Sequence, residues 1–273
     1  MKIVHTIEEL QTIRQTVSSR VGFVPTMGAL HNGHISLIKR AKAENDVVIV
    51  SVFVNPTQFL KGEDLDKYPK KIESDSKICE LCKVDYLFMP QISSMYSSDE
   101  VLVKAPLLKS YTLEGERRPG HFDGVLQVVL KLFALTQPTN AYFGKKDAQQ
   151  LALIQQMVKN FFLPINIVAC DIVRENDGLA LSSRNVYLDS AQRENALAIS
   201  KSLKIAAKLI GSGTLDCSFL KEQMQNSMQN IEIEYIAFVN RDFQEINTIV
   251  LGNSIILVAV KIGTTRLIDN IWI

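Results

Sequence analysis

Two segments that lie far apart in the chain carry side chains suited to phosphate chemistry. Residues 25–34, PTMGALHNGH, place two imidazoles and two glycines between an apolar stretch and a helical pattern. Residues 179–185, LALSSRN, combine two hydroxyls with a guanidinium. The first amides of a helix favour anions, and Arg forms paired hydrogen bonds with phosphate. The two segments therefore indicate an enzyme that holds ATP from two sides.

The histidines of the first segment are candidates for contact with phosphate. Gly28 and Gly33 permit close approach of the backbone, and His31 and His34, three residues apart, can face one side of the helix start. The alternative is that the glycines only form the turn and that the histidines cap the helix or lie on the surface. Because no Cys, Asp or Glu lies at metal-ligand spacing, we predict no protein-bound metal.

Two further loops follow apolar stretches and carry polar side chains. Gln58 follows one such stretch and offers both amide donors and a carbonyl acceptor, which suits a hydroxy acid. In residues 144–147, GKKD, Lys146 can neutralise phosphate, and Asp147 can cap a helix or meet a ribose hydroxyl. Gln150 lies one helical turn beyond Lys146. The alternatives are that Gln58 is a loop amide without a ligand and that residues 144–147 are a solvated run of charges.

Alternating strands and helices must position these loops. Strands are predicted near residues 21–25, 47–54, 86–89, 141–143 and 165–173, and helices near 7–17, 33–44, 69–82, 121–135 and 147–162. Crossovers between parallel strands are right-handed and cover the sheet with helices. We therefore predict a Rossmann-like, doubly wound α/β fold for this part of the chain.

The pattern changes in the last third of the chain. Helices near 191–210 and 216–229 come first, and strands near 234–240 and 255–261 follow them. Helices followed by strands indicate a smaller α+β domain. We expect an ATP- and substrate-binding domain at 1–173 and a C-terminal lid domain at 174–273.

Composition limits the possible partners and location of the protein. The 273 residues are 47% hydrophobic, enough for a sizeable core, and 30 basic against 29 acidic side chains give a net charge of +1. This balance argues against an extended basic surface for nucleic acid or anionic membrane. Residues 1–9 lack a signal-peptide core, and the apolar runs are shorter than the roughly 18 residues that span a bilayer. We expect a cytoplasmic protein.

Cys79 and Cys82 share the spacing of redox and zinc motifs. No second close pair completes a zinc site, and the two thiols lie at the end of a predicted helix rather than at its start. We expect small buried side chains, with redox activity as a distant alternative.

The residues now support a resemblance. Residues 31–34, HNGH, look like the His-x-Gly-His signature of adenylyl- and cytidylyltransferases. Several segments resemble the pantothenate synthetase (pantoate-beta-alanine ligase) family in order and spacing: residues 53–59 (FVNPTQF), 118–122 (RPGHF), 143–150 (FGKKDAQQ), 177–185 (DGLALSSRN) and 265–270 (TRLIDN). The resemblance covers essentially the whole chain.

The resemblance implies ATP-dependent condensation of pantoate with beta-alanine through a pantoyl adenylate, with Mg²⁺ accompanying ATP, in a homodimer. It implies that His34 donates a proton and that His31 contacts phosphate, while Lys146 and Arg184 stabilise charge. The implied ATP-binding residues are Met27, Gly28, Ala29, Leu30, His31, Asn32, Gly33, His34, Gly144, Lys145, Lys146, Asp147, Val173, Leu181, Ser182, Ser183 and Arg184. Gln58 is expected to bind pantoate and beta-alanine, and Gln150 to bind pantoate.

Some positions depart from the family pattern or have no firm role. Leu181 replaces a common methionine and Lys145 a common glutamate. Arg118 and His121 are expected to face the phosphates from a mobile loop, and no base for beta-alanine is identified. The alternatives are another adenylyl- or cytidylyltransferase of the same superfamily, and a nucleotide-binding module without catalysis.

Overall fold

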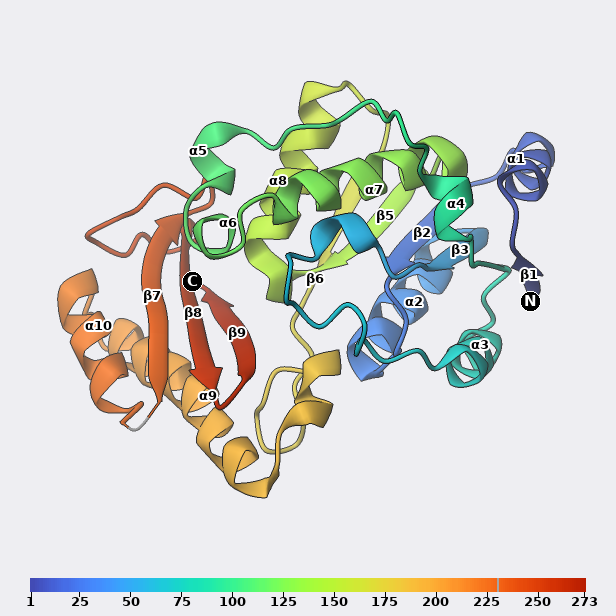
Figure 1. Cartoon of the computed structure of the whole chain (residues 1–273). Coiled ribbons are helices and arrows are strands. Elements are labelled where there is room, and N and C mark those ends of the chain that lie inside the picture. Colours follow the sequence, from blue (N-terminus) through green and yellow to red (C-terminus); the bar gives the residue numbers. More distant parts are fainter. Residues whose placement is uncertain (230) are drawn as a thin grey trace. The chain divides into compact units, whose positions relative to one another are not determined.

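Six parallel strands form the central sheet of the larger part of the chain (Figure 1). The computed structural model describes residues 1–229 and 231–273. The chain forms two units: the first unit comprises Met1–Lys145 and Leu153–Asp171, and the second unit comprises Lys146–Ala152 and Ile172–Ile273. The functional division at residues 173 and 174 stays a prediction.

The strand order of the first unit reverses at one point. The strands are β1 (Lys2–Val4), β2 (Val21–Thr26), β3 (Val47–Val52), β4 (Tyr86–Phe88), β5 (Asn140–Gly144) and β6 (Asn166–Cys170). They lie in the order β1-β4-β3-β2-β5-β6, and every pair is parallel. The chain runs from β2 outwards to β3 and β4, then returns to add β5 on the other side of β2. The switch point of this doubly wound sheet therefore lies between β2 and β5.

Helices cover both faces of the sheet. The helices that begin in the first unit are α1 (Ile7–Thr16), α2 (Asn32–Glu44), α3 (Ile72–Leu81), α4 (Ile92–Met95), α5 (Leu107–Ser110), α6 (Glu114–Arg117) and α7 (His121–Thr136), with the 3₁₀ turn η1 (Pro56–Gln58). On one face, Ile38 of α2 shares a core with Val24 of β2. On the other, Phe133 of α7 contacts Phe23 at 6.3 Å between ring centroids. Phe23 and Val24 are neighbours on β2, and neighbouring strand residues point to opposite faces. Helices therefore cover both faces of the sheet, and the α/β prediction is confirmed.

The second unit is an α+β arrangement. Its elements are η3 (Ser183–Tyr187), α9 (Ser190–Gly211), α10 (Cys217–Asn226), β7 (Glu232–Asn240), β8 (Ser254–Ile262) and β9 (Thr265–Trp272). The strands form an antiparallel sheet in the order β7-β8-β9. Leu203 of α9, Leu220 of α10 and Val258 of β8 meet in one core. The predicted smaller α+β fold is confirmed. The turn η2 (Lys145–Asp147) and helix α8 (Ala148–Asn160) each contain residues of both units.

Several predicted boundaries were wrong. Strand β6 ends at Cys170 rather than 173, because its partner β5 ends at Gly144, which is paired with Cys170. Helix α3 begins at Ile72 rather than 69, after the N-cap residue Lys71. Strand β9 was not predicted as a strand. It pairs with β8 along its whole length, with Thr265 opposite Ile262 at one end and Trp272 opposite Ile255 at the other.

The cysteines are free thiols. Cys79 is fully buried, and burial raises its pKa to about 12. Burial also raises the pKa of the half-buried Cys82. The prediction of a buried side chain at Cys79 is therefore confirmed. A thiol that stays protonated at neutral pH is also a poor redox nucleophile.

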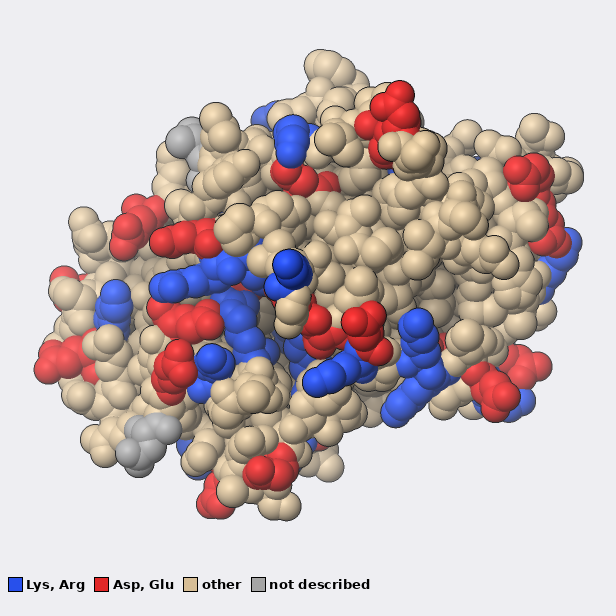
Figure 2. Space-filling model, in the orientation of Figure 1, with Lys and Arg blue, Asp and Glu red and all other residues tan. Residues whose placement is uncertain are grey.

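Both signs of charge share the surface. On the face drawn in Figure 2, Lys and Arg side chains lie among Asp and Glu side chains. This mixture agrees with the net charge of +1. Within residues 1–229 and 231–273, no helix combines the length and apolar character needed to cross a membrane.

Candidate functional site

The switch point of the first unit brings together two of the predicted loops. Residues 27–31 leave the carboxyl end of β2, and Gly144 and Lys145 lie at the carboxyl end of β5. These strands are neighbours, paired through Gly22–Asn140 and Phe23–Ala141. Open α/β sheets bind ligands in the crevice at this position.

The turn after β2 has an unusual backbone. Gly28 has φ +85° and Ala29 has φ +51°, both in the left-handed region. Thr26 Oγ1 accepts from the amide of Gly28 at 3.2 Å and donates to the carbonyl of Ser51 at 2.7 Å. A Cβ on Gly28 would lie 3.0 Å from the Asp75 carboxylate. The turn therefore requires glycine for both conformation and space.

Asp75 of α3 holds this turn. Its Oδ2 accepts from the amide of Ala29 at 2.9 Å, and its Oδ1 accepts from the amide of Leu30 at 2.7 Å. The side chain is 1% exposed. Sequence reasoning missed Asp75, since it lies 45 residues beyond Leu30 on a helix without a functional motif. We assign it the role of fixing the turn that precedes the histidines.

His31 and His34 form a reciprocal cap at the start of α2. His31 Nδ1 accepts from the amide of Gly33 at 3.1 Å, and His34 Nδ1 accepts from the amide of His31 at 3.3 Å. The ring centroids are 4.2 Å apart. When Nδ1 accepts a hydrogen bond, a neutral imidazole carries its proton on Nε2. Capping thus sets both rings in the tautomer whose Nε2–H can donate to a phosphate oxygen.

Most of the expected backbone donors are used within the protein. The amides of Gly28, Ala29, Leu30, His31 and Gly33 donate to Thr26, Asp75, His34 or His31 side chains. The simple picture of a free helix N-terminus that cradles phosphate does not hold for these five amides. The expectation of an anion site in the first unit therefore depends more on side-chain donors than on these amides.

Gln58 lies beside the same turn. Its Nε2 donates to Met27 Sδ at 3.1 Å, and its Oε1 accepts from Asn55 Nδ2 at 3.1 Å. The residue is 9% exposed. The structure therefore brings together Met27 and Gln58, which the sequence assigned to ATP and to pantoate.

Arg118 and His121 contact the backbone of Gln58. Arg118 forms a two-pronged ion pair with Glu63, with both N–O distances at 2.7 Å. His121 Nδ1 donates to the carbonyl of Gln58 at 2.8 Å, and its Nε2 accepts from Arg118 at 3.0 Å. Burial and then the Arg118 charge lower the pKa of His121 to about 4. These contacts support the backbone of Gln58, and the expected approach to phosphate stays a prediction.

Gly124 allows α7 to approach the Gln58 turn. A Cβ at this position would lie 2.3 Å from the carbonyl oxygen of Thr57 and 2.7 Å from the amide of Gln58. Asn55 Nδ2 also donates to the Gly124 carbonyl at 3.1 Å. The absence of a side chain thus permits backbone contact between α7 and η1.

Lys145 and Lys146 fall in different units. Lys145 Nζ is 2.6 Å from Asp171 Oδ1, so its positive charge has a carboxylate partner. Lys146 belongs to the second unit, where its carbonyl accepts from Asn270 Nδ2 at 2.8 Å. Its Nζ lies 3.7 Å from Asp147 Oδ1. Gln150 lies in the first turn of α8 and is half-buried.

A hairpin carries the serine and arginine segment of the second unit. The amide of Leu181 donates to the carbonyl of Val173 at 3.0 Å, which brings together two residues assigned to ATP. Ser182 caps η3 because its Oγ accepts from the amide of Arg184 at 3.3 Å. Asn185 Nδ2 donates to the Ala180 carbonyl at 3.1 Å. These bonds fix the segment's start and end on the hairpin.

The predicted site residues thus fall into two groups, each described within its own unit. The first-unit group comprises Met27, Gly28, Ala29, Leu30, His31, Asn32, Gly33, His34, Gln58, Gly144 and Lys145, and the second-unit group comprises Lys146, Asp147, Gln150, Val173, Leu181, Ser182, Ser183 and Arg184. In the part of the chain that the structure describes, no cluster of three or more His, Cys, Asp or Glu is placed to hold a metal ion.

The chain is similar to one family of known proteins along its whole length. The family model for pantoate-beta-alanine ligase matches residues 2–272. Pantothenate synthetase of Aliarcobacter butzleri (strain RM4018) is 67% identical over 273 residues, 100% of both chains. The crystal structure of pantothenate synthetase from Thermus thermophilus has a TM-score of 0.94 and 39% identity over 99% of each chain. Pantoate-beta-alanine ligase from Francisella tularensis, complexed with beta-gamma ATP and beta-alanine, has a TM-score of 0.83 and 41% identity, covering 100% of this chain and 97% of that one.

The contacts of Asp75 lead to a stability prediction. Asp75→Asn replaces one acceptor with an NH₂ group that faces a backbone amide, so we expect a loss of about 1–3 kcal/mol in the free energy of unfolding. Urea unfolding measures this loss. Glu73→Gln, at an exposed position on the same helix, is the matched control. Equal stability of the two variants would contradict the role given to Asp75.

His121 leads to a prediction about acid stability. Its pKa is about 4 in the folded protein against an ordinary value of 6.5, so the unfolded chain takes up a proton first as the pH falls. This group's contribution to stability is present above pH 6.5 and decreases towards pH 4, by at most about 1.4 kcal/mol per pH unit. In His121→Gln, urea unfolding at pH 7 and pH 5 should show a smaller difference in stability than in the wild type. His5→Gln, at an exposed histidine, should keep the wild-type difference.

Proposed function

Since the chain belongs to the pantoate-beta-alanine ligase family, we propose that the two groups of residues described above bind ATP and carry out its reaction. That reaction is the ATP-dependent condensation of pantoate with beta-alanine to pantothenate, AMP and diphosphate, in pantothenate and coenzyme A biosynthesis. The observation that supports the site most strongly is the His31–His34 cap at the switch point, which leaves both imidazoles in the Nε2–H form.

The reaction proceeds in two steps because a carboxylate is a poor acylating agent. The pantoate carboxylate attacks the α-phosphorus of ATP, the bond from this phosphorus to the bridging oxygen breaks, and diphosphate leaves. The amine of beta-alanine then attacks the pantoyl adenylate, an amide bond forms, and AMP leaves. No covalent enzyme nucleophile takes part, so alignment and charge stabilisation provide the catalysis.

The imidazoles act on the phosphate chain in this proposal. His34 donates from Nε2 as negative charge develops on the phosphate oxygens, and His31 contacts a neighbouring phosphate. The rings need no rearrangement because the caps already set their tautomer. Donors that are oriented before the reaction stabilise the transition state without reorganisation.

The second unit contributes cations to the proposed chemistry. Lys146 provides a point charge, and the planar guanidinium of Arg184 can pair with two phosphate oxygens. Ser182 and Ser183 add hydroxyls, while Asp147 meets the ribose. Mg²⁺ enters with ATP as part of the substrate and neutralises charge on the departing diphosphate.

The substrate acid and the adenine have separate contacts. Gln58 binds pantoate and beta-alanine and Gln150 binds pantoate; the buried Gln58 amide is already oriented by Asn55. Val173 and Leu181 frame the adenine. Leucine has an apolar volume close to that of the methionine common in the family, so ATP binding is retained.

The proposal also includes the state of the protein in the cell. We expect a cytoplasmic homodimer whose partners are small molecules, without nucleic acid or membrane. The near-neutral charge and the family resemblance support this expectation.

An assay of product release tests the proposed function. With ATP, Mg²⁺ and pantoate, the protein should release diphosphate and retain pantoyl adenylate, and added beta-alanine should cause AMP release and pantothenate formation. AMP release that does not depend on beta-alanine, or a released adenylylated product, would favour another nucleotidyltransferase of the superfamily.

His34 provides the mutational test. His34→Ala should slow single-turnover formation of pantoyl adenylate by roughly 10²- to 10³-fold, as expected for loss of one donor to developing charge. Rapid quench with radiolabelled ATP measures this rate. Lys39→Ala, an exposed position on the same helix, is the control. A rate near that of the wild type would remove His34 from the reacting centre.

A further inference from the structure

Residues 265–270, TRLIDN, form a family-like segment for which the proposed function has no role. They lie in β9, at the edge of the three-stranded sheet. Edge strands usually leave polar side chains in water, yet Asp269 is 3% exposed and Asn270 is 1% exposed. Buried polar groups need hydrogen-bond partners, and these partners belong to the proposed ATP site or its support.

Asp269 holds the base of the hairpin that precedes the serine and arginine segment. Its two oxygens accept from Arg174 at 2.6 and 3.0 Å. Arg174 also donates to the carbonyl of Gly178 at 3.2 Å, so it links both sides of the hairpin. Val173 and Leu181, which frame the adenine in the proposal, lie on either side of residues 174–178 in sequence. The backbone amide of Leu181 donates to the carbonyl of Val173.

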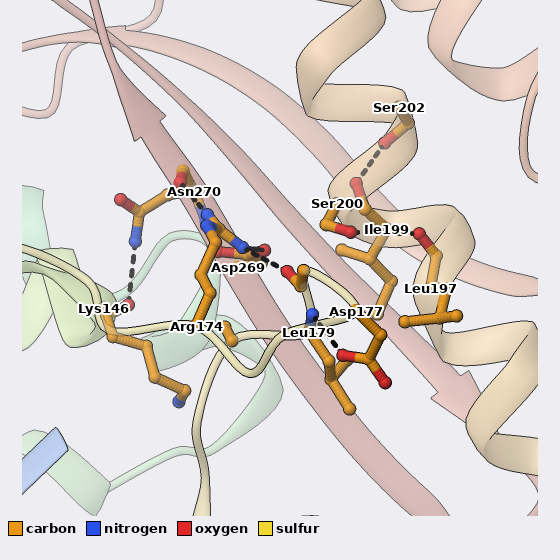
Figure 3. Close-up of polar contacts among 12 residues, drawn as sticks. Lys146, Arg174, Asp177, Leu179, Leu197, Ile199, Ser200, Ser202, Asp269 and Asn270 are labelled. Carbon is orange, nitrogen blue, oxygen red and sulfur yellow. Dashed lines mark hydrogen bonds and ion pairs between the residues drawn. The ribbon is translucent and has the colours of Figure 1, made fainter. Parts of the chain in front are cut away.

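Asn270 holds Lys146. Its Nδ2 donates to the carbonyl of Lys146 at 2.8 Å, and its Oδ1 accepts from Trp272 Nε1 at 2.9 Å. An indole N–H can only donate, so this contact fixes which end of the amide faces Lys146. Figure 3 shows the Lys146 side chain extending away from Asn270. The Asn270 amide therefore holds the backbone of Lys146 and does not contact its ammonium group (Figure 3). The position of that backbone determines where the lysine side chain starts.

We infer that Asn270 is a positioning residue for Lys146, and that β9 sets the phosphate lysine and the adenine hairpin on one rigid strand. This inference rests on the proposed function. Side chains at successive strand positions point to opposite faces, so adjacent residues can hold Arg174 and Lys146 at once. A displacement of about 1 Å in a reacting group can lower a rate about 10²-fold, so a fixed backbone at Lys146 matters for the chemistry.

A double-mutant cycle on pantoyl adenylate formation tests the inference. Single-turnover rates are measured for wild type, Asn270→Ala, Lys146→Ala and the double variant. We expect Asn270→Ala to slow the step by about tenfold to hundredfold in the wild-type background, and by less than about twofold in the Lys146→Ala background. A residue that only stabilises the fold would slow the step by the same factor in both backgrounds, and that result would overturn the inference.

Two controls separate positioning from stability. Asn240→Ala removes a side chain at the end of β7 that bonds Gln244 at 3.0 Å, and it should leave the adenylation rate unchanged. Far-UV circular dichroism and urea unfolding should show that Asn270→Ala remains folded; Trp272 fluorescence is unsuitable, because Asn270 is the hydrogen-bond partner of its indole. If that variant does not fold, Trp272→Phe is measured instead. This change removes the donor that orients the Asn270 amide and also alters the ring that contacts Arg241. It should slow the step when Lys146 is present and leave the rate of Lys146→Ala unchanged.

The outcomes distinguish the inference from the function beneath it. If Lys146→Ala leaves adenylation unchanged, the proposed role of Lys146 fails, and the inference with it. If Lys146→Ala slows the step but neither Asn270→Ala nor Trp272→Phe changes the rate, only the inference fails.

Discussion

One buried carboxylate, Asp75, fixes the geometry on which the histidine site depends. The turn after β2 places Ala29 in the left-handed region, a conformation that is unfavourable by roughly 1–2 kcal/mol for a residue with a Cβ. Asp75 offsets this by accepting from two successive amides that would otherwise be buried without partners. The direction in which the chain enters α2, and so the position of His31 and His34, follows from that contact.

The two units contribute different kinds of group to the proposed chemistry. The first unit offers uncharged donors, the two imidazoles and the Gln58 amide, each held by a specific neighbour. The second unit offers the cations Lys146 and Arg184. Uncharged, oriented donors suit the attacking acid and the α-phosphate, whereas full charges suit the departing diphosphate.

Much of the fold could be predicted from the sequence because local patterns determine it. The apolar runs at β2, β3 and β5 are buried on both faces, as is typical of parallel strands. The apolar residues of α2 recur with the helical spacing expected of a helix packed on a sheet. The end of β6 could not be predicted, since it depends on where β5 stops pairing. Strand β9 was hidden because its polar Asp269 and Asn270 are buried by contacts with Arg174 and Lys146.

The candidate site shows the same limit. The types and spacing of His31 and His34 mark them as candidates, because the strand, the glycine and the helix start are contiguous in sequence. Asp75 and the support of Gln58 by His121 were not predictable, since they join segments 45 and 63 residues apart. The ion pair of Arg118 with Glu63 was not predictable for a related reason, because Glu63 lies in a loop without a recognisable pattern.

Gly124 has a consequence for how freely this sequence can vary. Glycine inside a helix is about 1 kcal/mol less favourable than alanine, so propensity alone marks α7 as an easy route to a more thermostable enzyme. The methyl group of alanine would overlap the Thr57 carbonyl, and relieving that overlap would move the turn that carries Gln58. The usual substitution of glycine by alanine to strengthen a helix is therefore excluded at this position, in evolution as in engineering, because α7 must lie against the backbone of the Gln58 turn.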